Sequence, residues 1–461
     1  MTISLRSAPR LLALLGLVSP AARAAAQTIP SQDSVVAFVD VTVLPMDRDR
    51  VLEHQTVVVR GSTIATVGPT ASTQVPKGAG RIDGRGKFLM PGLVDMHGHF
   101  MAGAGDPGDG AHRQFTWFLA NGVTTVRGLG GPPTYLTTRD RANRGEVLAP
   151  MLYAAGGSIH GGSTKTGAEA AKKVRDAKAQ GYDWIKTHGG FPREVYDSMI
   201  AAAKQVGIPV SGHVSHQYGL LHALESGQQV EHLDGYLAVL AGDTGEAGAW
   251  NDGQIVLDPA ILDRIDESRI PQVVAATKRS GTCAGPTLAL FQIVASGLSP
   301  EEMAQWPEMR YVDAKMAEAF ADQVRQFDIP KAGEAAKRYL AIRDKITKAL
   351  YDGGVPLLAG GDSPQFFVVP GFSLHRELEA FRKAGIPPYG VLEAATVNAA
   401  RCLGAEREFG TVAAGKRADL LLLDSDPRRD LARRESIAGV MTRGRWLDRA
   451  ALQQSLDRLA R

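Results

Sequence analysis

The chain has 461 residues, with 52 lysines and arginines against 49 aspartates and glutamates and a formal net charge of +3. This near balance does not support binding to nucleic acid or to an anionic membrane. The length is sufficient for a large barrel with an attached domain. The two cysteines, Cys283 and Cys402, fit neither a disulfide framework nor a thiolate zinc site, and the sequence leaves open whether they pair.

The first 26 residues have the pattern of a signal peptide. Arg6 and Arg10 precede an apolar run at 11–18, and small residues follow up to Gln27. A charged start, a short apolar stretch and a small-residue cleavage site are typical of secretory signals, and the run is too short to span a membrane. We therefore expect residues 1–26 to be removed and the mature protein to be periplasmic or secreted.

The two ends of the remaining chain resemble each other in composition. Between residues 28 and 90, short runs rich in Val, Ile and Thr are broken by Gly, Pro and Asp, as strands and turns are. Residues 418–424 and 437–446 have the same character. We expect 27–90 and 403–461 to form one small β-sandwich domain together.

Residues 91–402 alternate apolar strand segments with amphipathic stretches such as 168–180 and 194–205. Alternation of strand and helix predicts a parallel sheet, and eight units predict a closed (β/α)8 TIM barrel. Residues 234–280 and 288–350 are longer than simple connections, so we expect them to contain helices of their own. After a first strand that ends in His-Gly-His, the strands are expected at 122–126, 151–155, 184–186, 208–213, 229–232, 282–286 and 355–359.

The most informative motif is His97-Gly98-His99. Residues two apart on a strand point to the same face, so both imidazoles can face one space, as metal ligands must. An HxH motif alone is weak evidence, but the apolar run and the Pro-Gly pair before it indicate a buried strand. Function in such a barrel gathers at the carboxyl ends of the strands. The further candidate ligands at such ends are Lys186, His213, His232 and Asp362.

Lys186 is an unusual candidate, because an ammonium group cannot bind a cation. If CO2 adds to its amine, the carbamate oxygens can bridge two metal ions about 3.5–4 Å apart, and burial favours the neutral amine that this addition needs. Imidazole and carboxylate groups suit zinc and similar ions. We expect two divalent ions, zinc in the first place, and CO2 as a carbamate on Lys186. The alternative is an ordinary lysine beside a one-metal site.

Other polar residues near the strand ends are candidates for catalysis or substrate binding. Asp362 is the expected acid–base, although it could instead cap the following helix. His160, in a glycine-rich loop after the third strand, is expected to polarise the scissile carbonyl or to hold substrate. His188, on the strand face of Lys186, and Tyr236, just past the sixth strand, are further candidates for substrate binding.

The chain resembles the amidohydrolase superfamily, in the branch of imidazolonepropionase-like enzymes and metal-dependent Xaa-Pro dipeptidases. The resemblance covers nearly the whole mature chain and is carried by residues 90–99, 184–188, 231–235 and 410–420. It implies that His97, His99 and Asp362 bind a first metal ion, that His213 and His232 bind a second, and that Lys186 is the carboxylated bridge. One departure is Arg127-Gly128, where the family often has Arg-Asp, so the polar contacts at the base of the site are left open.

The function that we expect is hydrolysis of a C–N amide bond in small molecules, namely Xaa-Pro dipeptides or N-acyl amino acids. A hydroxide bridging the metals would attack the carbonyl while Asp362 moves the proton, and one metal with His160 would stabilise the oxyanion. One alternative is hydrolysis of a cyclic amide, lactone or phosphotriester on the same centre. Another, of a different class, is a non-catalytic binding protein on a relic barrel. No nucleic-acid or membrane partner is expected, and the oligomeric state is left open.

Overall fold

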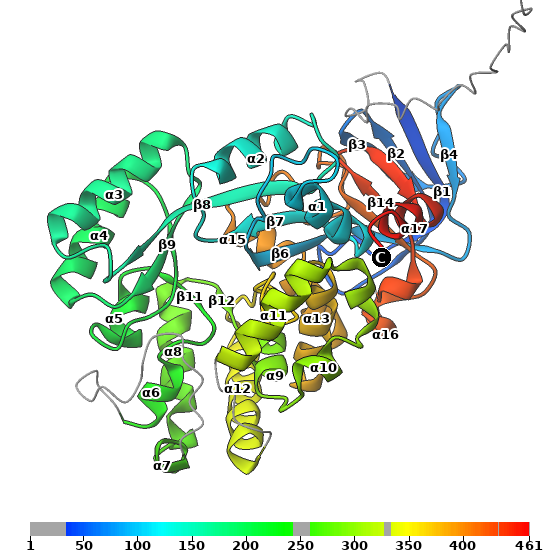
Figure 1. The fold of residues 1–461 in the computed structure, drawn as a ribbon. Helices are drawn as coiled ribbons and strands as arrows, with labels where there is room; N and C mark the ends of the chain where they lie inside the picture. The colour runs from blue at the N-terminus through cyan, green and yellow to red at the C-terminus, as the bar shows by residue number, and fades with distance from the viewer. Residues whose placement is uncertain (1–33, 243–258, 327–332, 432, 461) are drawn as a thin grey trace, which may run out of the picture.

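The computed structural model describes residues 34–242, 259–326, 333–431 and 433–460, so the expected signal peptide lies outside the described residues. Two sheets organise the molecule (Figure 1). One contains strands from both ends of the chain, drawn in blue and red, and the other forms the barrel. No helix in the described ranges is long and apolar enough to cross a membrane.

The small domain is an eight-stranded mixed sheet with the order β15-β14-β13-β5-β1-β2-β3, and β4 pairs with β1. The N-terminal and C-terminal strands meet where β13 runs antiparallel to β5, with Leu421 opposite Met90. Alternate side chains of these strands, such as Phe38 and Leu420, fill a separate apolar core. A β domain built from both ends is therefore confirmed. Its strands are β1 Val35–Val43, β2 Leu52–Arg60, β3 Thr63–Pro69, β4 Gly80–Asp83, β5 Phe88–Pro91, β13 Leu420–Leu423, β14 Ile437–Thr442 and β15 Arg445–Asp448.

The barrel sheet has seven parallel strands in the simple order β6 to β12. Sequential parallel strands with helices between them form the curved wall of a barrel, and the carboxyl ends of all the strands lie on the same side of it. The expected barrel class is therefore confirmed. The strands are β6 Leu93–Gly98, β7 Val123–Gly128, β8 Met151–His160, β9 Trp184–Gly189, β10 Val210–Gly212, β11 Gln229–Glu231 and β12 Ala284–Gly285.

The expected eighth strand at 355–359 is not a regular strand. The segment closes the barrel by isolated parallel bridges, Leu357 with Ala284 on one side and Ser363 with Gly98 on the other. Pro356 has no N–H for a ladder. At Gly360 a Cβ atom would lie 2.7 Å from the Cβ of His97, so only glycine allows this close approach. The eighth unit is therefore present as an irregular closing segment, and the barrel sheet is nearly closed.

The helices follow the expected pattern. The expected helices at 168–180 and 194–205 correspond to α3 and α4, and a capping box of Thr166 and Glu169 starts the first of them. The long connections at 234–280 and 288–350 contain helices, as expected. The helices are α1 Gly110–Ala120, α2 Thr134–Asn143, α3 Gly167–Gln180, α4 Arg193–Val206, α5 Gly219–Glu225, α6 Tyr236–Leu240, α7 Pro259–Leu262, α8 Ile270–Ser280, α9 Leu288–Val294, α10 Pro300–Met303, α11 Ala314–Gln326, α12 Glu334–Asp352, α13 Phe372–Lys383, α14 Pro388–Ala394, α15 Val397–Cys402, α16 Pro427–Asp430 and α17 Arg449–Asp457.

Cys283 and Cys402 form a disulfide whose Cα atoms are 6.4 Å apart. It joins the residue before β12 to the last residue of α15. The two cysteines are 119 positions apart, and the sequence had left their pairing open.

Candidate metal centre

Five of the six expected metal ligands lie at the carboxyl ends of barrel strands or of the closing segment, whereas Lys186 is the third residue of β9, which was expected to end at 186 but continues to Gly189. Two belong to strands, His97 to β6 and Lys186 to β9, and the others directly follow a strand or the closing segment. The residues in the second group are His99, His213, His232 and Asp362.

The tightest cluster is formed by His97, His99 and Asp362, which offer ligand atoms within 4.8 Å of one another. Asp362 Oδ1 lies 2.8 Å from His99 Nε2 and 3.4 Å from His97 Nε2. His97 and Asp362 are buried, and His99 is partly exposed. Two imidazoles and a carboxylate converging in this way form a candidate metal site.

His232 and His213 extend this cluster. His232 Nε2 is 3.7 Å from Asp362 Oδ2, and its ring centroid is 4.6 Å from that of His97. The ring of His213 stacks on His232, with centroids 4.7 Å apart. The structure therefore brings five of the six expected ligands into one continuous group around Asp362.

Lys186 is fully buried, and its Nζ has no hydrogen-bond partner among the described residues. Burial lowers the pKa of its amine, while the negative charges of Glu231 and Asp362 oppose that shift. A buried lysine without a partner is costly, so this amine calls for another group to satisfy it. Carboxylation by CO2 would do so.

The second nitrogen of three histidines is held by a partner outside the cluster. Nδ1 of His97 lies 2.9 Å from Glu231, Nδ1 of His213 lies 2.7 Å from Asp234, and Nδ1 of His232 lies 2.8 Å from the hydroxyl of Thr287. Hydrogen bonds of this kind orient ligand imidazoles and fix the proton on the outer nitrogen. The inner Nε2 atoms then have lone pairs available for a metal ion.

Glu231 anchors the base of the site. Its carboxylate binds Arg127 at 2.7 Å and also accepts hydrogen bonds from Ser211 and Gln229, each at 2.6 Å. Arg127 itself is fully buried and donates to the carbonyl of Met96. The family often has an aspartate after this arginine, whereas this chain has Gly128. Here Glu231 supplies the acidic partner of Arg127 at the base of the site.

Burial favours the neutral form of the His97 and His232 imidazoles, the form that binds metal. It lowers the pKa of His97 to about 4 and moves that of His232 well below its ordinary value. Burial works in the opposite direction on Asp362, but the facing imidazoles of His97 and His99 hold the pKa of that carboxyl well below its usual range. Asp362 is therefore ionised in the neutral range, as a ligand must be.

Residues at the strand ends adopt unusual backbone conformations. His232, Thr287 and Asp362 have φ values of 63°, 48° and 52°. Left-handed conformations of non-glycine residues cost about 1–3 kcal/mol each and persist where the surroundings impose them. Their concentration at this end of the barrel is typical of a functional site.

The remaining expected site residues differ in their positions. His188 lies against His213, with ring centroids 4.9 Å apart, and its Nδ1 bonds Ser158. His160 is exposed and is the last residue of β8, not part of a loop, because the strand continues until His160 pairs with Gly189. The expected roles of both histidines stay predictions.

Tyr236 begins α6 and is fully buried. Its hydroxyl shares a 2.8 Å hydrogen bond with Thr277 of α8. These contacts are those of a packing residue in the barrel wall and do not support the expected contact with substrate.

Several residues of the site were not singled out from the sequence. Glu231 and Asp234 flank His232 in the segment 231–235, so their position beside a candidate ligand was a usable signal. Arg127 and Thr287 have no such local signal, because their partners come from other strands.

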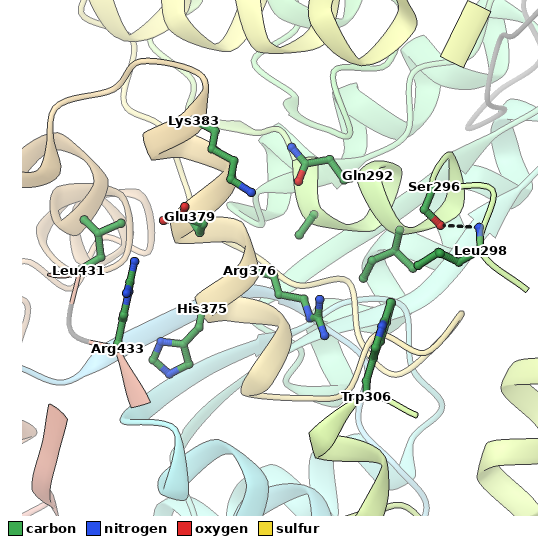
Figure 2. Close-up of a pocket in the computed structure, with 12 residues that line it drawn as sticks. Gln292, Ser296, Leu298, Trp306, His375, Arg376, Glu379, Lys383, Leu431 and Arg433 are labelled. Atoms are coloured by element: carbon green, nitrogen blue, oxygen red, sulfur yellow. Dashed lines mark hydrogen bonds between the residues drawn. The ribbon is translucent and has the colours of Figure 1, made fainter. Parts of the chain in front are cut away.

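A cavity of about 510 Å³ lies elsewhere, between α9 and α13 (Figure 2). Figure 2 shows Arg376 and Lys383 of α13 and Gln292 of α9 around it, with Trp306 at one side. None of the six candidate ligands lines it, so this cavity is separate from the metal centre.

The donor set fits a metal ion. The buried Nε2 of His97 and the buried Nζ of Lys186 have no hydrogen-bond partner in the described part of the chain, and both are directed into a group of imidazole and carboxylate donors. Those donors are the ones that zinc and similar divalent ions prefer.

A barrel with histidine and aspartate donors at its carboxyl end defines a metal-dependent hydrolase. The amidohydrolase family model matches residues 88–447, and the chain belongs to this family. An imidazolonepropionase of Rubrobacter xylanophilus is 27% identical over 406 residues, which cover 82% of this chain and 86% of that protein.

Two solved structures share the fold. A bottromycin amidohydrolase superposes with a TM-score of 0.69 at 23% identity, covering 92% of this chain and 90% of that one. A Xaa-Pro dipeptidase with methionine bound in its active site superposes with a TM-score of 0.65 at 21% identity, covering 90% of this chain and 100% of that one.

Proposed function

We propose that this protein hydrolyses the C–N amide bond of Xaa-Pro dipeptides or of N-acyl amino acids. The observation that carries the proposal is the Asp362 carboxylate, which contacts His97 and His99 through one oxygen and His232 through the other. A carboxylate so placed can serve as a ligand and as the acid–base. The fold likeness to a Xaa-Pro dipeptidase that holds methionine supports a substrate with an amino-acid backbone.

The proposed centre holds two divalent ions, zinc in the first place. His97, His99 and Asp362 would hold one ion, His213 and His232 the other, and carboxylated Lys186 would lie between them. When bound, such ions polarise a carbonyl group and lower the pKa of water to about 7.

The chain's own groups would move the proton and hold the substrate. Asp362 accepts the proton of the attacking water on its carboxylate and returns it to the departing nitrogen. His160 and His188 are proposed to contact the substrate. Tyr236 is not proposed for this role, because its hydroxyl bonds Thr277 in the barrel wall.

The first experiment measures metal content. Protein prepared with ample zinc and bicarbonate should hold two ions per chain, and Lys186→Ala should lose metal and activity. Short-chain carboxylic acids with bicarbonate should restore part of both by replacing the carbamate. Lys172→Ala is the matched control, since Lys172 is exposed and pairs with Asp176 on α3. Full metal content and full activity in Lys186→Ala would refute the bridging role.

The second experiment identifies the substrate class with a panel of Xaa-Pro dipeptides and N-acyl amino acids. A second candidate is hydrolysis of a cyclic amide, lactone or phosphotriester, which stays open because one of the sequence relatives is an imidazolonepropionase. A metal-loaded protein that is active only on the second group of compounds would replace the first proposal with this one.

Export is also proposed. The charged, apolar and small-residue order of residues 1–26 supports it, and so does the Cys283–Cys402 disulfide, because disulfides persist in oxidising compartments. The mature chain should begin near Gln27. N-terminal sequencing of native protein that finds Met1 intact would contradict this.

A further inference from the structure

His232 and Thr287 are two candidate-site residues held in the left-handed region, with φ values of 63° and 48°. Thr287 is β-branched, a residue type for which this conformation is a clear outlier. Both residues are buried. Such strain persists only where neighbouring groups fix the backbone on either side, and two buried charged side chains bond the backbone here.

Arg343 of α12 bonds the carbonyl group of His232 and the carbonyl group that directly precedes Thr287. Its Nη2 donates to the carbonyl of His232 at 2.8 Å and to the carbonyl of Pro286 at 2.9 Å. The guanidinium lies 3.6 Å above the ring of Phe291 in α9. Arg343 is buried. Burying a charge costs free energy unless hydrogen bonds compensate for the lost water, and these two carbonyl groups supply such bonds.

Glu377 of α13 bonds the two backbone N–H groups that follow Thr287. Its two carboxyl oxygens accept hydrogen bonds from the N–H groups of Leu288 and Ala289, at 3.0 Å and 2.7 Å. These are the first residues of α9, directly after Thr287. Glu377 is fully buried, whereas Arg376 and Glu379 of the same helix line the cavity of Figure 2. The backbone around Thr287 is thus held by a cationic side chain before it and an acidic one after it.

The held threonine also determines which nitrogen of His232 carries the proton. The hydroxyl of Thr287 donates its single hydrogen to the carbonyl of Pro286 at 2.8 Å, because a carbonyl can only accept. Its 2.8 Å bond to His232 must then be donated by the Nδ1–H of the imidazole. Nε2 therefore has its lone pair free, 3.7 Å from Asp362 Oδ2.

We propose that Arg343 and Glu377 are positioning residues that hold Thr287 and His232 in their left-handed conformations and so present the Nε2 lone pair of His232 to a metal ion. Neither side chain bonds the imidazole itself; both act through the backbone. The proposal rests on the metal centre of the proposed function and adds the elements α12 and α13 to its support.

The test compares Glu377→Gln, Arg343→Lys and Thr287→Val of the mature chain with matched controls on the same helices. Gln offers one carbonyl acceptor in place of two carboxyl oxygens. Lys lacks the planar guanidinium that lies on the ring of Phe291 and so fixes the donor nitrogen, and Val replaces only the hydroxyl. The controls are Glu379→Gln on α13 and Arg338→Lys on α12, where Glu379 pairs with Arg382 and Arg338 with Asp263.

Zinc affinity is measured by competition with a chelator. Loss of groups that orient a metal ligand typically lowers affinity about 10–100-fold, so we expect this loss in the three variants and no change in the controls. Thr287→Ser keeps the hydroxyl and should restore the affinity. Affinities in Thr287→Val and Glu377→Gln equal to those of the controls would overturn the proposal.

A second readout needs no metal. Nitrogen-15 NMR of the histidine rings in metal-free protein should show His232 as the Nδ1–H tautomer, and Thr287→Val should lose that preference. An unchanged tautomer in Thr287→Val overturns the proposal even if Glu377→Gln and Arg343→Lys fail to fold. Failure to bind two zinc ions, with the tautomer as expected, would instead contradict the two-metal centre and leave the positioning role supported.

Discussion

The candidate metal centre has two sides that are built differently. On the strand side, defined by His97 and His99, the ligands come from the end of β6, a fully buried six-residue strand that pairs with β7. On the loop side, defined by His232 and Asp362, the ligands follow a three-residue strand and an irregular segment, and both have positive φ.

The difference shows two ways to fix a ligand. On the strand side, the backbone hydrogen bonds between the parallel strands fix the backbone conformation of the ligands. Glu231, which is paired with Arg127, holds the imidazole of His97 by a hydrogen bond. On the loop side the ladder is too short, so buried side chains hold the backbone directly, as Arg343 and Glu377 do. Four substitutions test this comparison: the first at Asp362, where the two sides meet, the second on the strand side and the last two on the loop side.

The largest effect is expected at Asp362, where the two sides meet. Asp362→Asn keeps the shape and one coordinating oxygen but cannot accept a proton. If Asp362 moves the proton, the variant should keep much of its metal while turnover falls about 10²–10⁴-fold. The measurement is turnover per bound metal ion. If Asp362 were only a ligand, activity would follow metal content and added zinc would restore it. Near-normal turnover in fully metallated Asp362→Asn would move the proton transfer to another group.

The strand side is tested by Glu231→Gln, which leaves Arg127 buried without a charged partner. Breaking a buried ion pair from one side costs about 3–5 kcal/mol, so the free energy of unfolding in urea should fall by that amount. Glu334→Gln is the control, because Glu334 is exposed and pairs with Lys337 at the surface, where such pairs contribute about 0–1 kcal/mol. Equal losses in the two variants would show that Glu231 does not anchor the site.

The loop side is tested by Cys283→Ser, which removes the disulfide before β12. A disulfide typically stabilises a protein by about 2–4 kcal/mol, and the free energy of unfolding should fall accordingly. Reduction of the wild-type protein should give the same loss, and reduction of the variant should add nothing. A variant as stable as oxidised wild type would show that β11 and β12 do not depend on this bridge.

The smallest effect is expected at Asp344, beside Arg343 on the loop side. Burial raises the pKa of this carboxyl to about 6 from 3.8, so the folded protein holds a proton that the unfolded chain has lost. Stability therefore falls as pH rises from about 3.8 to about 6. Asp344→Asn cannot titrate, so its unfolding free energy should lack that slope and exceed the wild-type value by about 1 kcal/mol at neutral pH. Parallel pH profiles of the two proteins would contradict this.

The sequence by itself determined the fold class, the β domain shared by both ends and the position of five of the six candidate ligands at strand ends. These features depend on patterns within a few residues, such as the apolar run before His97 and the strand–helix alternation. That locality also explains the limits, since the sequence placed a regular eighth strand at 355–359 and ended the strands β8 and β9 at residues 155 and 186, short of their actual ends at His160 and Gly189.

The tertiary structure alone decided which groups meet across the barrel. His97 and Glu231 are 134 positions apart, and Arg127 and Glu231 are 104 positions apart. The Cys283–Cys402 pairing, the left-handed backbone at His232 and Thr287, and the buried positions of Arg343 and Glu377 belong to the same group of findings. Local periodicity tells which face of a segment is buried, but the partner that a buried polar group finds depends on how all the segments pack, because each such group must be satisfied by whatever packing places beside it.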